Sequence, residues 1–580
     1  MTGIDTEATA RLRPNESFAM VAGARTFSLE DTFLEPQILN PPPTRHALFV
    51  FLLTLAAVLH IGTAGWGDLY DGVEGQFAGG AREMVESNQW LVPTNDGAPL
   101  PQTPPLVYWL IAGSFKIFGV TATAARLPIA LAMVASVAFT FLIGERLAGY
   151  WRGFAAGLLH LCSCGVFVLD RMVTPDAIFA ALIGGAIFCA VAGYQRRQFR
   201  RAWFAGFWLC GSFACLAKGL GTIFYLAGIC VLLAIFFREA RIRFSFLLHW
   251  SYLLLFLAIV APWFVWTEMR FPGALLQAFR ENNAGLPRTP FLFLHLLWWS
   301  PAIILVLPGL LFATRRIIRH EITFADALPV CWMAVGFVPV LLVGERHAWS
   351  SLSVWPAVAL GAACAWERAP RGLRLAGIAL LILVGAALGA TGTFAPDTFA
   401  FFSDLNWLEL RPMVQLAALS LIILSLPTLY FVRRRRAEIS LLLALAPMLP
   451  AGFCLMESAS RVAPFFSLAD PAQFLNQRLG TNGQVIYEGP LQSASSLTFY
   501  LNKKFFLVNQ APSRFEKSEA DRNKYLDENF VLEAWSRADP LYFIVEERRV
   551  AYWRKLIMER VHIYHQVTSC GRYVILSNQL

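Results

Sequence analysis

The chain has 580 residues, of which 57% are hydrophobic and only 15% are Asp, Glu, Lys or Arg. A soluble domain carries about 25% charged residues, so this chain has too little polar surface to face water everywhere, and its mean hydropathy of +0.53 agrees. The composition excludes a disordered chain, a collagen, a coiled coil and a cytosolic enzyme. The net charge of +9 lies mostly in arginine clusters between apolar runs, so we expect it to set membrane topology and do not expect nucleic acid as a partner.

Residues 1–46 contain no apolar run typical of a signal peptide, so we expect a cytoplasmic N-terminal tail. Residues 47–456 then carry about thirteen apolar runs, each near the ~20 residues that a membrane-spanning helix needs. The runs lie at 47–64, 127–145, 153–169, 177–194, 202–217, 220–237, 246–267, 291–313, 326–343, 351–366, 375–394, 413–432 and 439–456. The sequence therefore predicts a polytopic α-helical membrane domain over residues 47–456.

The loops between these runs alternate in charge. Six arginine clusters fall on one side: Arg146 and Arg152; Arg196, Arg197, Arg200 and Arg201; Arg238, Arg241 and Arg243; Arg315, Arg316 and Arg319; Arg368, Arg371 and Arg374; and Arg433 to Arg436. Arginine-rich loops stay in the cytoplasm, so this side is predicted to be cytoplasmic. An odd number of spans then places two long segments outside the cytoplasm, residues 65–126 and 457–580.

The first outer loop, residues 65–126, is too polar to span the membrane. Apolar residues at helical spacing from Glu74, with Arg82 and Glu86 four residues apart, predict an interfacial helix. A turn-rich connection and a second, short apolar helix follow. We expect Trp90, Tyr108 and Trp109 at the level of the lipid headgroups. The alternative for Glu74 and Arg82 is a solvated helix face.

Charged side chains lie at the outer ends of the predicted spans and in the outer loops, while the span centres are nearly free of them. The residues in question are Asp71, Glu74, Asp176, Arg288 and Arg346. An ion-coupled transporter needs a site at the membrane midplane, whereas an enzyme acting on a lipid-anchored substrate needs one at the surface. The pattern favours such an enzyme, although Asp176, which follows Thr174 and Pro175, is also explained as an N-terminal helix cap.

The C-terminal segment, residues 457–580, is predicted to form a small α/β domain. Asp470 and Pro471 favour the start of a helix that runs through Leu479. Apolar runs predict strands at 484–488, 541–545 and 573–577, with a hairpin turn at Gly571. The segment carries no metal-ligand spacing, phosphate-binding glycine loop or nucleophile elbow. We therefore interpret it as a structural or acceptor-positioning cap.

One stretch carries a specific resemblance, over roughly sixty residues from Glu74: EGQFAGGAREMVESNQWLVPTNDGAPLPQTPPLVYWLIAGSFKIFGVTATAARLPIALA. It resembles the first outer loop of the aminoarabinose transferase and protein mannosyltransferase superfamily, membrane glycosyltransferases of the GT-C fold. That loop combines an Asp-Glu pair, an Arg-Glu-Met helix end, a Trp-Pro turn, a Lys-Pro-Pro-Leu-Tyr-Trp segment and an Ala-Arg-Leu-Pro opening of the second span. Weaker similarities continue through 174–176, Arg288 and 355–357.

The resemblance implies roles for individual residues. Glu74 matches the Glu of the pair, Arg82 the helix end, Arg126 the arginine of Ala-Arg-Leu-Pro, and Asp176 the acidic residue after the third span. Two positions depart from the pattern, because Val73 replaces the leading Asp, expected to activate the acceptor, and Thr103 replaces the Lys expected to contact phosphate. Either Asp71 or Glu74 takes the base role and Arg288 the phosphate role, or the activity is changed or lost.

The implied function is transfer of a hexosyl or pentosyl group from a polyprenyl-phosphate-linked sugar to a lipid, glycan or protein acceptor, at the outer face of a bacterial inner membrane. The catalytic candidates are Glu74, Asp71 and Asp176, and the substrate-binding candidates are Arg82, Arg126, Arg288, Arg346 and Tyr108. Membrane lipids are the other expected partners, and no metal or other cofactor is expected. The alternatives are a flippase or exporter of lipid-linked sugars and an inactive scaffold that binds polyprenyl lipid.

Overall fold

The computed structural model describes residues 43–579, except 170, 197, 282–285, 320, 344–345, 395–406, 435, 481, 513–514, 516–522 and 538. Helices occupy all the predicted spans. They are α1 (Pro43–His60), α4 (Ala122–Ala148), α5 (Tyr150–Leu161), α6 (Val166–Leu169), α7 (Pro175–Gln195), α8 (Arg200–Lys218), α9 (Gly221–Phe236), α11 (Trp250–Arg270), α13 (Arg288–Trp298), α14 (Ile303–Ile318), α15 (Phe324–Val343), α16 (Trp355–Arg368), α17 (Arg371–Phe394), α18 (Trp407–Ile423), α19 (Leu426–Arg433), α20 (Ala437–Leu445) and α21 (Met448–Val462). Two short helices, α10 (Arg238–Phe244) and α12 (Ala274–Glu281), lie between spans.

Seven described helical segments are long and apolar enough to cross a membrane, and four shorter apolar helices accompany them. The chain is therefore a helical membrane protein, while the count of thirteen spans remains a prediction. Some predicted spans consist of two helices, and a proline stands at or near the break. Pro301 separates α13 from α14, and Pro447 separates α20 from α21. Proline lacks a backbone N–H and clashes with the preceding turn, so an uninterrupted helix is disfavoured there.

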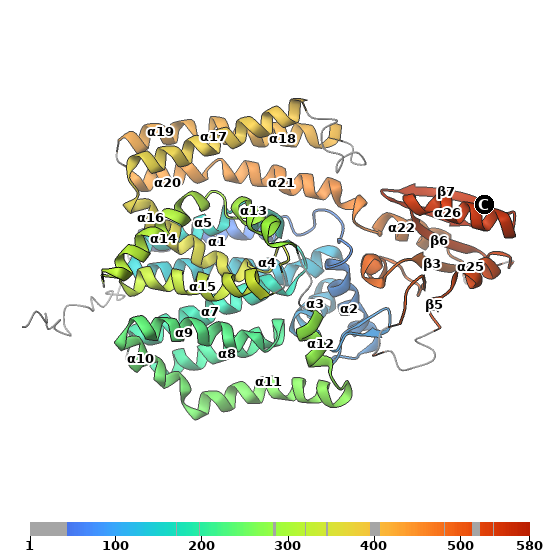
Figure 1. The fold of residues 1–580 in the computed structure, drawn as a ribbon, viewed down its shortest axis with the longest axis horizontal. Coiled ribbons are helices and arrows are strands. Elements are labelled where there is room, and N and C mark those ends of the chain that lie inside the picture. Colours follow the sequence, from blue (N-terminus) through green and yellow to red (C-terminus); the bar gives the residue numbers. More distant parts are fainter. Residues whose placement is uncertain are drawn as a thin grey trace, which may run out of the picture. The chain divides into compact units, whose positions relative to one another are not determined.

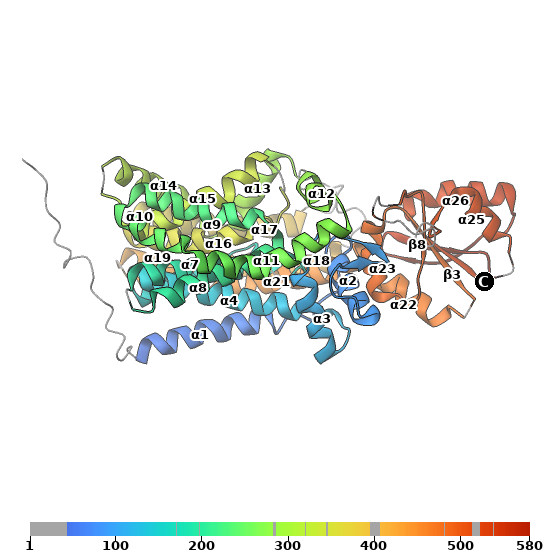
Figure 2. The same cartoon turned by 90° about the horizontal axis from the view of Figure 1, so that it is seen from below.

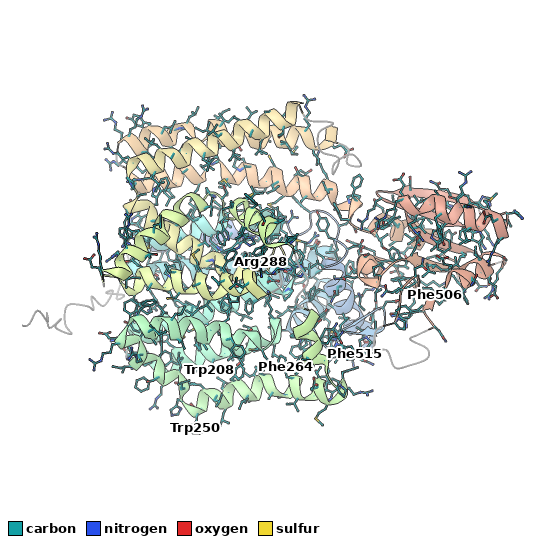
Figure 3. All side chains as sticks on the ribbon, viewed as in Figure 1. Trp208, Trp250, Phe264, Arg288, Phe506 and Phe515 are labelled. Atoms are coloured by element: carbon teal, nitrogen blue, oxygen red, sulfur yellow. The ribbon has the colours of Figure 1, made fainter. Side chains whose placement is uncertain are left out.

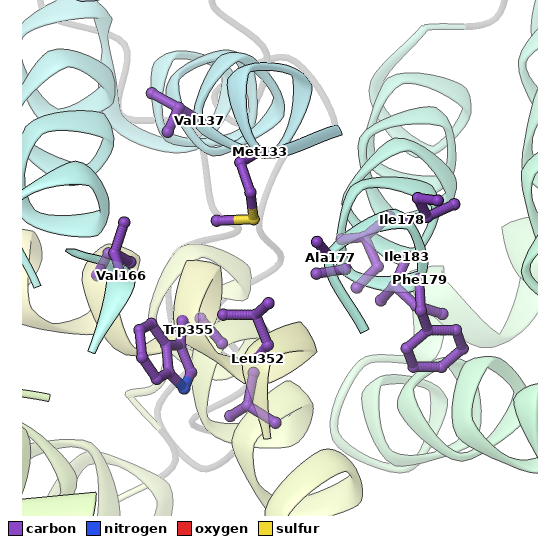
Figure 4. Packing of buried hydrophobic residues seen from close by; sticks show 14 of the residues in the cluster. Met133, Val137, Val166, Ala177, Ile178, Phe179, Ile183, Leu352 and Trp355 are labelled. Atoms are coloured by element: carbon purple, nitrogen blue, oxygen red, sulfur yellow. The ribbon is translucent and has the colours of Figure 1, made fainter. Parts of the chain in front are cut away.

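Residues 48–580 form one compact unit, in which α4 and α7 are central. Figure 4 shows Met133 and Val137 of α4 and Ile178 and Ile183 of α7 turned into the same apolar core. Small residues let α7 approach its neighbours closely, because a Cβ on Gly185 would lie 3.2 Å from the Cys210 sulfur. In Figure 1, α10, which carries an arginine cluster, lies at the opposite end of the bundle from α2 and α3. The assignment of these ends to the two sides of a membrane remains a prediction.

The first outer loop folds into α2 (Glu74–Ser87), the strand pair β1 (Thr94–Asn95) and β2 (Ala98–Pro99), and α3 (Leu106–Phe118). The prediction of an interfacial helix is wrong for α2, because most of its residues are buried against α3 and α23 (Ser495–Tyr500). Glycine makes this contact possible, since a Cβ on Gly75 would lie 2.3 Å from the backbone of Ser496. Tyr108 is fully buried and packs on Phe77, and its level in the membrane remains a prediction.

The C-terminal region is a mixed six-stranded sheet in the order β5-β4-β3-β6-β8-β7. The strands are β3 (Gln484–Glu488), β4 (Phe506–Val508), β5 (Tyr525–Leu526), β6 (Leu541–Glu546), β7 (His565–Cys570) and β8 (Tyr573–Ser577). Strands β3, β4, β5 and β6 are parallel, and β7 and β8 form an antiparallel hairpin with Gly571 in its turn. The three predicted strands are confirmed. The predicted helix begins two residues early as α22 (Ala469–Arg478), because Leu468 and not Asp470 occupies the cap position.

Helices cover both faces of this sheet. Helices α22 and α23 lie on one face, and α25 (Glu528–Trp535) and α26 (Glu547–Arg560) lie on the other, as Figure 2 shows. Successive residues of β3 alternate between the two layers, because Val485 and Tyr487 join one apolar cluster and Ile486 joins the other. The domain boundary at 457 and the location of this domain outside the cytoplasm remain predictions.

Candidate active site

Glu74 and Arg126 form a buried ion pair between the first residue of α2 and the first turns of α4. Arg126 Nε lies 3.0 Å from Glu74 Oε1, and its NH2 lies 2.9 Å from Oε2. The backbone N–H groups of Tyr70 and Val173 also donate to this carboxylate, at 2.9 and 3.0 Å. A carboxylate has about four acceptor positions, so these four donors fill them. The alternative of a solvated helix face is therefore wrong for Glu74, which has no exposed surface.

Arg126 also holds the chain that leads into α2. It donates to the carbonyl oxygens of Trp66, Gly67 and Asp68 at 2.8–2.9 Å. The buried guanidinium thus fixes the backbone of the outer loop on one side and Glu74 on the other. Together these contacts give Arg126 the geometry of a positioning residue at the centre of the loop.

Arg82 faces the C-terminal region. Its pair with Glu86 is present at 2.7 Å, as the spacing predicted. The same guanidinium donates to the carbonyl oxygens of Phe499 and Leu501, at 2.6 and 3.2 Å. The solvated alternative is therefore wrong for Arg82 as well, since it joins α2 to the end of α23.

Asp176 lies in the first turn of α7 and pairs with a cation that the sequence analysis missed. Thr174, not Asp176, caps the helix, because its hydroxyl oxygen accepts from the backbone N–H of Asp176. Asp176 is buried, and its Oδ1 lies 2.5 Å from the Nζ of Lys218, the last residue of α8. The sequence signal for this cation is that Lys218 stands alone between the apolar runs 202–217 and 220–237. Val173, which shortly precedes Asp176 in the chain, donates its backbone N–H to Glu74. This hydrogen bond links the start of α7 to the pair of Glu74 and Arg126.

Asp71 is directed toward the C-terminal region instead of toward Glu74. Its backbone N–H donates to the carbonyl oxygen of Phe466, and its Oδ1 accepts from the backbone N–H of Ser496 at 2.7 Å. Its Oδ2 is buried and has no hydrogen-bond partner among the described residues. Burial raises the pKa of Asp71 to about 7, although hydrogen bonds from Ser496 and Tyr573 and the nearby Arg572 lower it.

Arg288 and Arg346 lie in another part of the chain, where Arg288 is the first residue of α13 and Arg346 follows the end of α15. Arg288 donates to the carbonyl oxygen of Leu342 at 3.0 Å, and Arg346 to that of Leu286 at 2.7 Å. Within the described ranges, no hydrogen bond joins either arginine to Asp71, Glu74 or Asp176. Figure 3 labels Arg288 on the helical bundle, where it is exposed, and Phe506 on the sheet of the C-terminal region. The phosphate role of Arg288 therefore stays a prediction.

Val73 and Thr103 occupy the two positions that depart from the expected pattern. Val73 immediately precedes α2, and Thr103 lies in the connection before α3. Tyr108 is fully buried, and its contact with substrate stays a prediction. Among the described residues, no group of three or more His, Cys, Asp or Glu side chains is placed to hold a metal ion.

Comparison with known proteins agrees with this architecture. A family model described as dolichyl-phosphate-mannose-protein mannosyltransferase matches residues 102–266. An uncharacterized protein of Aquifex aeolicus (strain VF5) is 24% identical over 320 residues, which cover 54% of this chain. The aligned region spans 62% of that relative's length.

Two solved structures have similar folds. The structure of ArnT from Cupriavidus metallidurans bound to undecaprenyl phosphate matches with a TM-score of 0.78 at 19% identity, over 92% of this chain and 98% of ArnT. An oligosaccharyltransferase of Archaeoglobus fulgidus in the apo form matches with a TM-score of 0.50 at 11% identity, over 91% of this chain and 74% of that chain. The chain therefore has the fold of ArnT, which confirms its resemblance to glycosyltransferases of the GT-C fold.

Proposed function

We propose that the protein transfers a glycosyl group from a polyprenyl-phosphate-linked sugar to a hydroxyl group of a lipid, glycan or protein acceptor. The transfer takes place at the outer face of a bacterial inner membrane. The observation that carries this proposal is the similarity of 92% of the chain to ArnT, whose structure holds undecaprenyl phosphate. Charged pairs in the first outer loop and at the start of α7 support it, because transfer from a phosphate needs both carboxylates and cations.

In the proposed step, the acceptor oxygen attacks the anomeric carbon of the donor sugar. The bond from that carbon to the phosphate oxygen breaks, and polyprenyl phosphate leaves with the electron pair. The acceptor proton passes to a carboxylate of the protein. A cation stabilises the charge that develops on the phosphate.

We assign the cation role to Lys218, with Arg288 as the other candidate. Lys218 pairs with Asp176, and its side chain is 21% exposed. Thr103 lies where the resemblance implies a lysine, so a cation from another element would supply the missing charge. A lysine ammonium is suited to bind phosphate as a point charge.

We assign the base role to Asp71. Glu74 is held by four donors and positions the loop, and Asp176 is paired with Lys218. Asp71 has an oxygen without a described partner and a pKa raised to about 7, which suits a general base at neutral pH. Because that oxygen is buried beside Ser496, the acceptor would reach it when α23 moves away from the outer loop.

The test measures glycosyl transfer by the full-length protein in vesicles. The vesicles contain a polyprenyl-phosphate-linked sugar that carries the label on its sugar. Transfer predicts release of unlabelled polyprenyl phosphate together with a labelled acceptor. Movement of the intact labelled lipid across the vesicle without cleavage would overturn the proposal in favour of a flippase. Binding of the lipid with neither cleavage nor movement would overturn it in favour of a scaffold.

A further inference from the structure

The order in which the chain adds strands to the C-terminal sheet reverses between β3 and β6. From β3 the chain passes to β4 on one side, while β6 lies parallel to β3 on the other. The carboxyl ends of β3, β4 and β6 therefore meet at one edge of the sheet. In open α/β sheets, ligands bind outside the carboxyl ends of the strands at such a switch point.

Glu488, the last residue of β3, lies at this edge. All its described hydrogen bonds fall on one oxygen: Oε1 accepts from Arg549 Nε at 3.0 Å, from Arg549 NH2 at 2.7 Å and from Asn509 Nδ2 at 3.1 Å. The other oxygen, Oε2, is buried and has no partner within the described part of the chain. The side chain is only 8% exposed. A buried carboxylate oxygen without a donor is costly, so it indicates a missing hydrogen-bond donor at this position.

The surroundings of Glu488 define the chemistry of that donor. Asn509 also donates to Glu528 Oε1 at 3.2 Å, and the hydroxyl of Tyr552 donates to Glu528 Oε2 at 2.7 Å. Tyr552 is 41% exposed, so an aromatic side chain stands at the rim. Two carboxylates and one guanidinium, that of Arg549, leave a net negative charge. An anionic ligand is therefore disfavoured, and the group that fits beside Glu488 Oε2 is a hydrogen-bond donor such as a hydroxyl group.

We propose that this edge, made by Glu488, Asn509, Glu528, Arg549 and Tyr552, is a binding site for an uncharged, hydroxyl-rich carbohydrate. A sugar hydroxyl donates to Glu488 Oε2, and the sugar ring packs beside Tyr552, away from the Arg549 guanidinium that lies 4.2 Å from the centroid of the Tyr552 ring. This inference rests on the proposed function in one respect, because it assigns the bound sugar to the glycan part of the acceptor. It gives the C-terminal region the role of holding the acceptor.

The experiment measures saturation transfer by NMR from the full-length protein in lipid nanodiscs to methyl glycosides of glucose, galactose and mannose. Glucuronic acid serves as the anionic comparison. We expect transfer to the neutral glycosides and little to glucuronic acid. Glu488→Gln replaces an acceptor oxygen by an NH2 donor and should weaken binding by at least about tenfold.

The matched control is Glu533→Gln, which makes the same charge change at an exposed position of α25. It should leave binding unchanged. Tyr552→Ala, at an exposed position, should weaken binding without loss of folding and covers the case in which Glu488→Gln does not fold. Absence of saturation transfer to all three neutral glycosides would overturn the proposal. Saturation transfer in both Glu488→Gln and Tyr552→Ala that equals that of the parent protein would also overturn it. The NMR experiment contains no donor lipid. A failure of sugar binding is therefore distinguishable from a failure of glycosyl transfer.

Discussion

Replacement of Asp71 by Asn separates a catalytic role of this carboxyl group from a structural one. Asn keeps the shape of protonated Asp, and its oxygen still accepts from the Ser496 N–H, but it cannot ionise or take a proton. A residue that needs its charge for catalysis while the charge costs stability is expected at a functional site.

The magnitude follows from the pKa of Asp71, which burial raises from 3.8 to about 7 in the folded protein. The folded state then binds more protons than the unfolded state between these values, so stability falls as the pH rises through this window. Each unit corresponds to about 1.36 kcal/mol, so ionisation of Asp71 costs roughly 4 kcal/mol above pH 7. Asp71→Asn should therefore raise stability at pH 8, and the difference should vanish near pH 4.

The assay follows thermal unfolding of both proteins in detergent by tryptophan fluorescence from pH 4 to pH 8. Activity is followed over the same range with the labelled donor. In the parent protein, kcat/KM should rise with pH through an inflection near 7, since the base must be ionised. Asp71→Asn should lose this inflection and fall in turnover by ~10²–10⁴. The reasoning would be refuted if the thermal midpoints of the parent protein and of Asp71→Asn changed with pH in the same way. An unchanged dependence of kcat/KM on pH in Asp71→Asn would also refute it.

Other predictions concern the remaining charged residues. Glu74→Gln leaves the buried guanidinium of Arg126 without its counter-charge and should destabilise the protein by ~3–5 kcal/mol, seen as a lower thermal midpoint at neutral pH. Lys218→Gln should raise the KM for the donor and lower kcat, and it should also lower the thermal midpoint because the buried carboxylate of Asp176 loses its counter-charge; an unchanged KM in the folded variant would remove this cation from the phosphate site. Arg288→Lys should be tolerated if Arg288 only anchors the helix at the interface, and should lower turnover if it makes a bidentate phosphate contact; normal donor affinity in both Arg288→Lys and Arg288→Ala would exclude it. A reporter fused after Leu580 should be detected outside the cytoplasm, and a cytoplasmic signal would reverse the assignment of the outer loop.

The sequence predicted the parts of the fold that depend on local pattern. Apolar runs of the length of a membrane span identified the helices, and short apolar runs identified β3 and β8 with the observed bounds. The pattern did not predict the helix breaks near Pro301 and Pro447, because a proline inside an apolar run is compatible with a kinked span as well as with two helices. It also assigned α2 to the membrane surface, since an amphipathic helix has the same pattern whether lipid or protein covers it.

The candidate site could be predicted only as a set of residues, because its function depends on pairings between distant segments. Glu74 meets Arg126 across 52 residues, Asp176 meets Lys218 across 42, and Asp71 meets Ser496 across 425. Each pairing changes what a carboxylate can do: four donors leave Glu74 no acceptor position for a proton, whereas burial beside Ser496 leaves Asp71 one oxygen and a raised pKa. Because the partner of Asp71 comes from the C-terminal region, the proposed role of Asp71 as a base depends on how that region packs. Loop and C-terminal region thus form one site in energetic terms, and substitutions at their contact should alter the pH dependence of the proposed reaction.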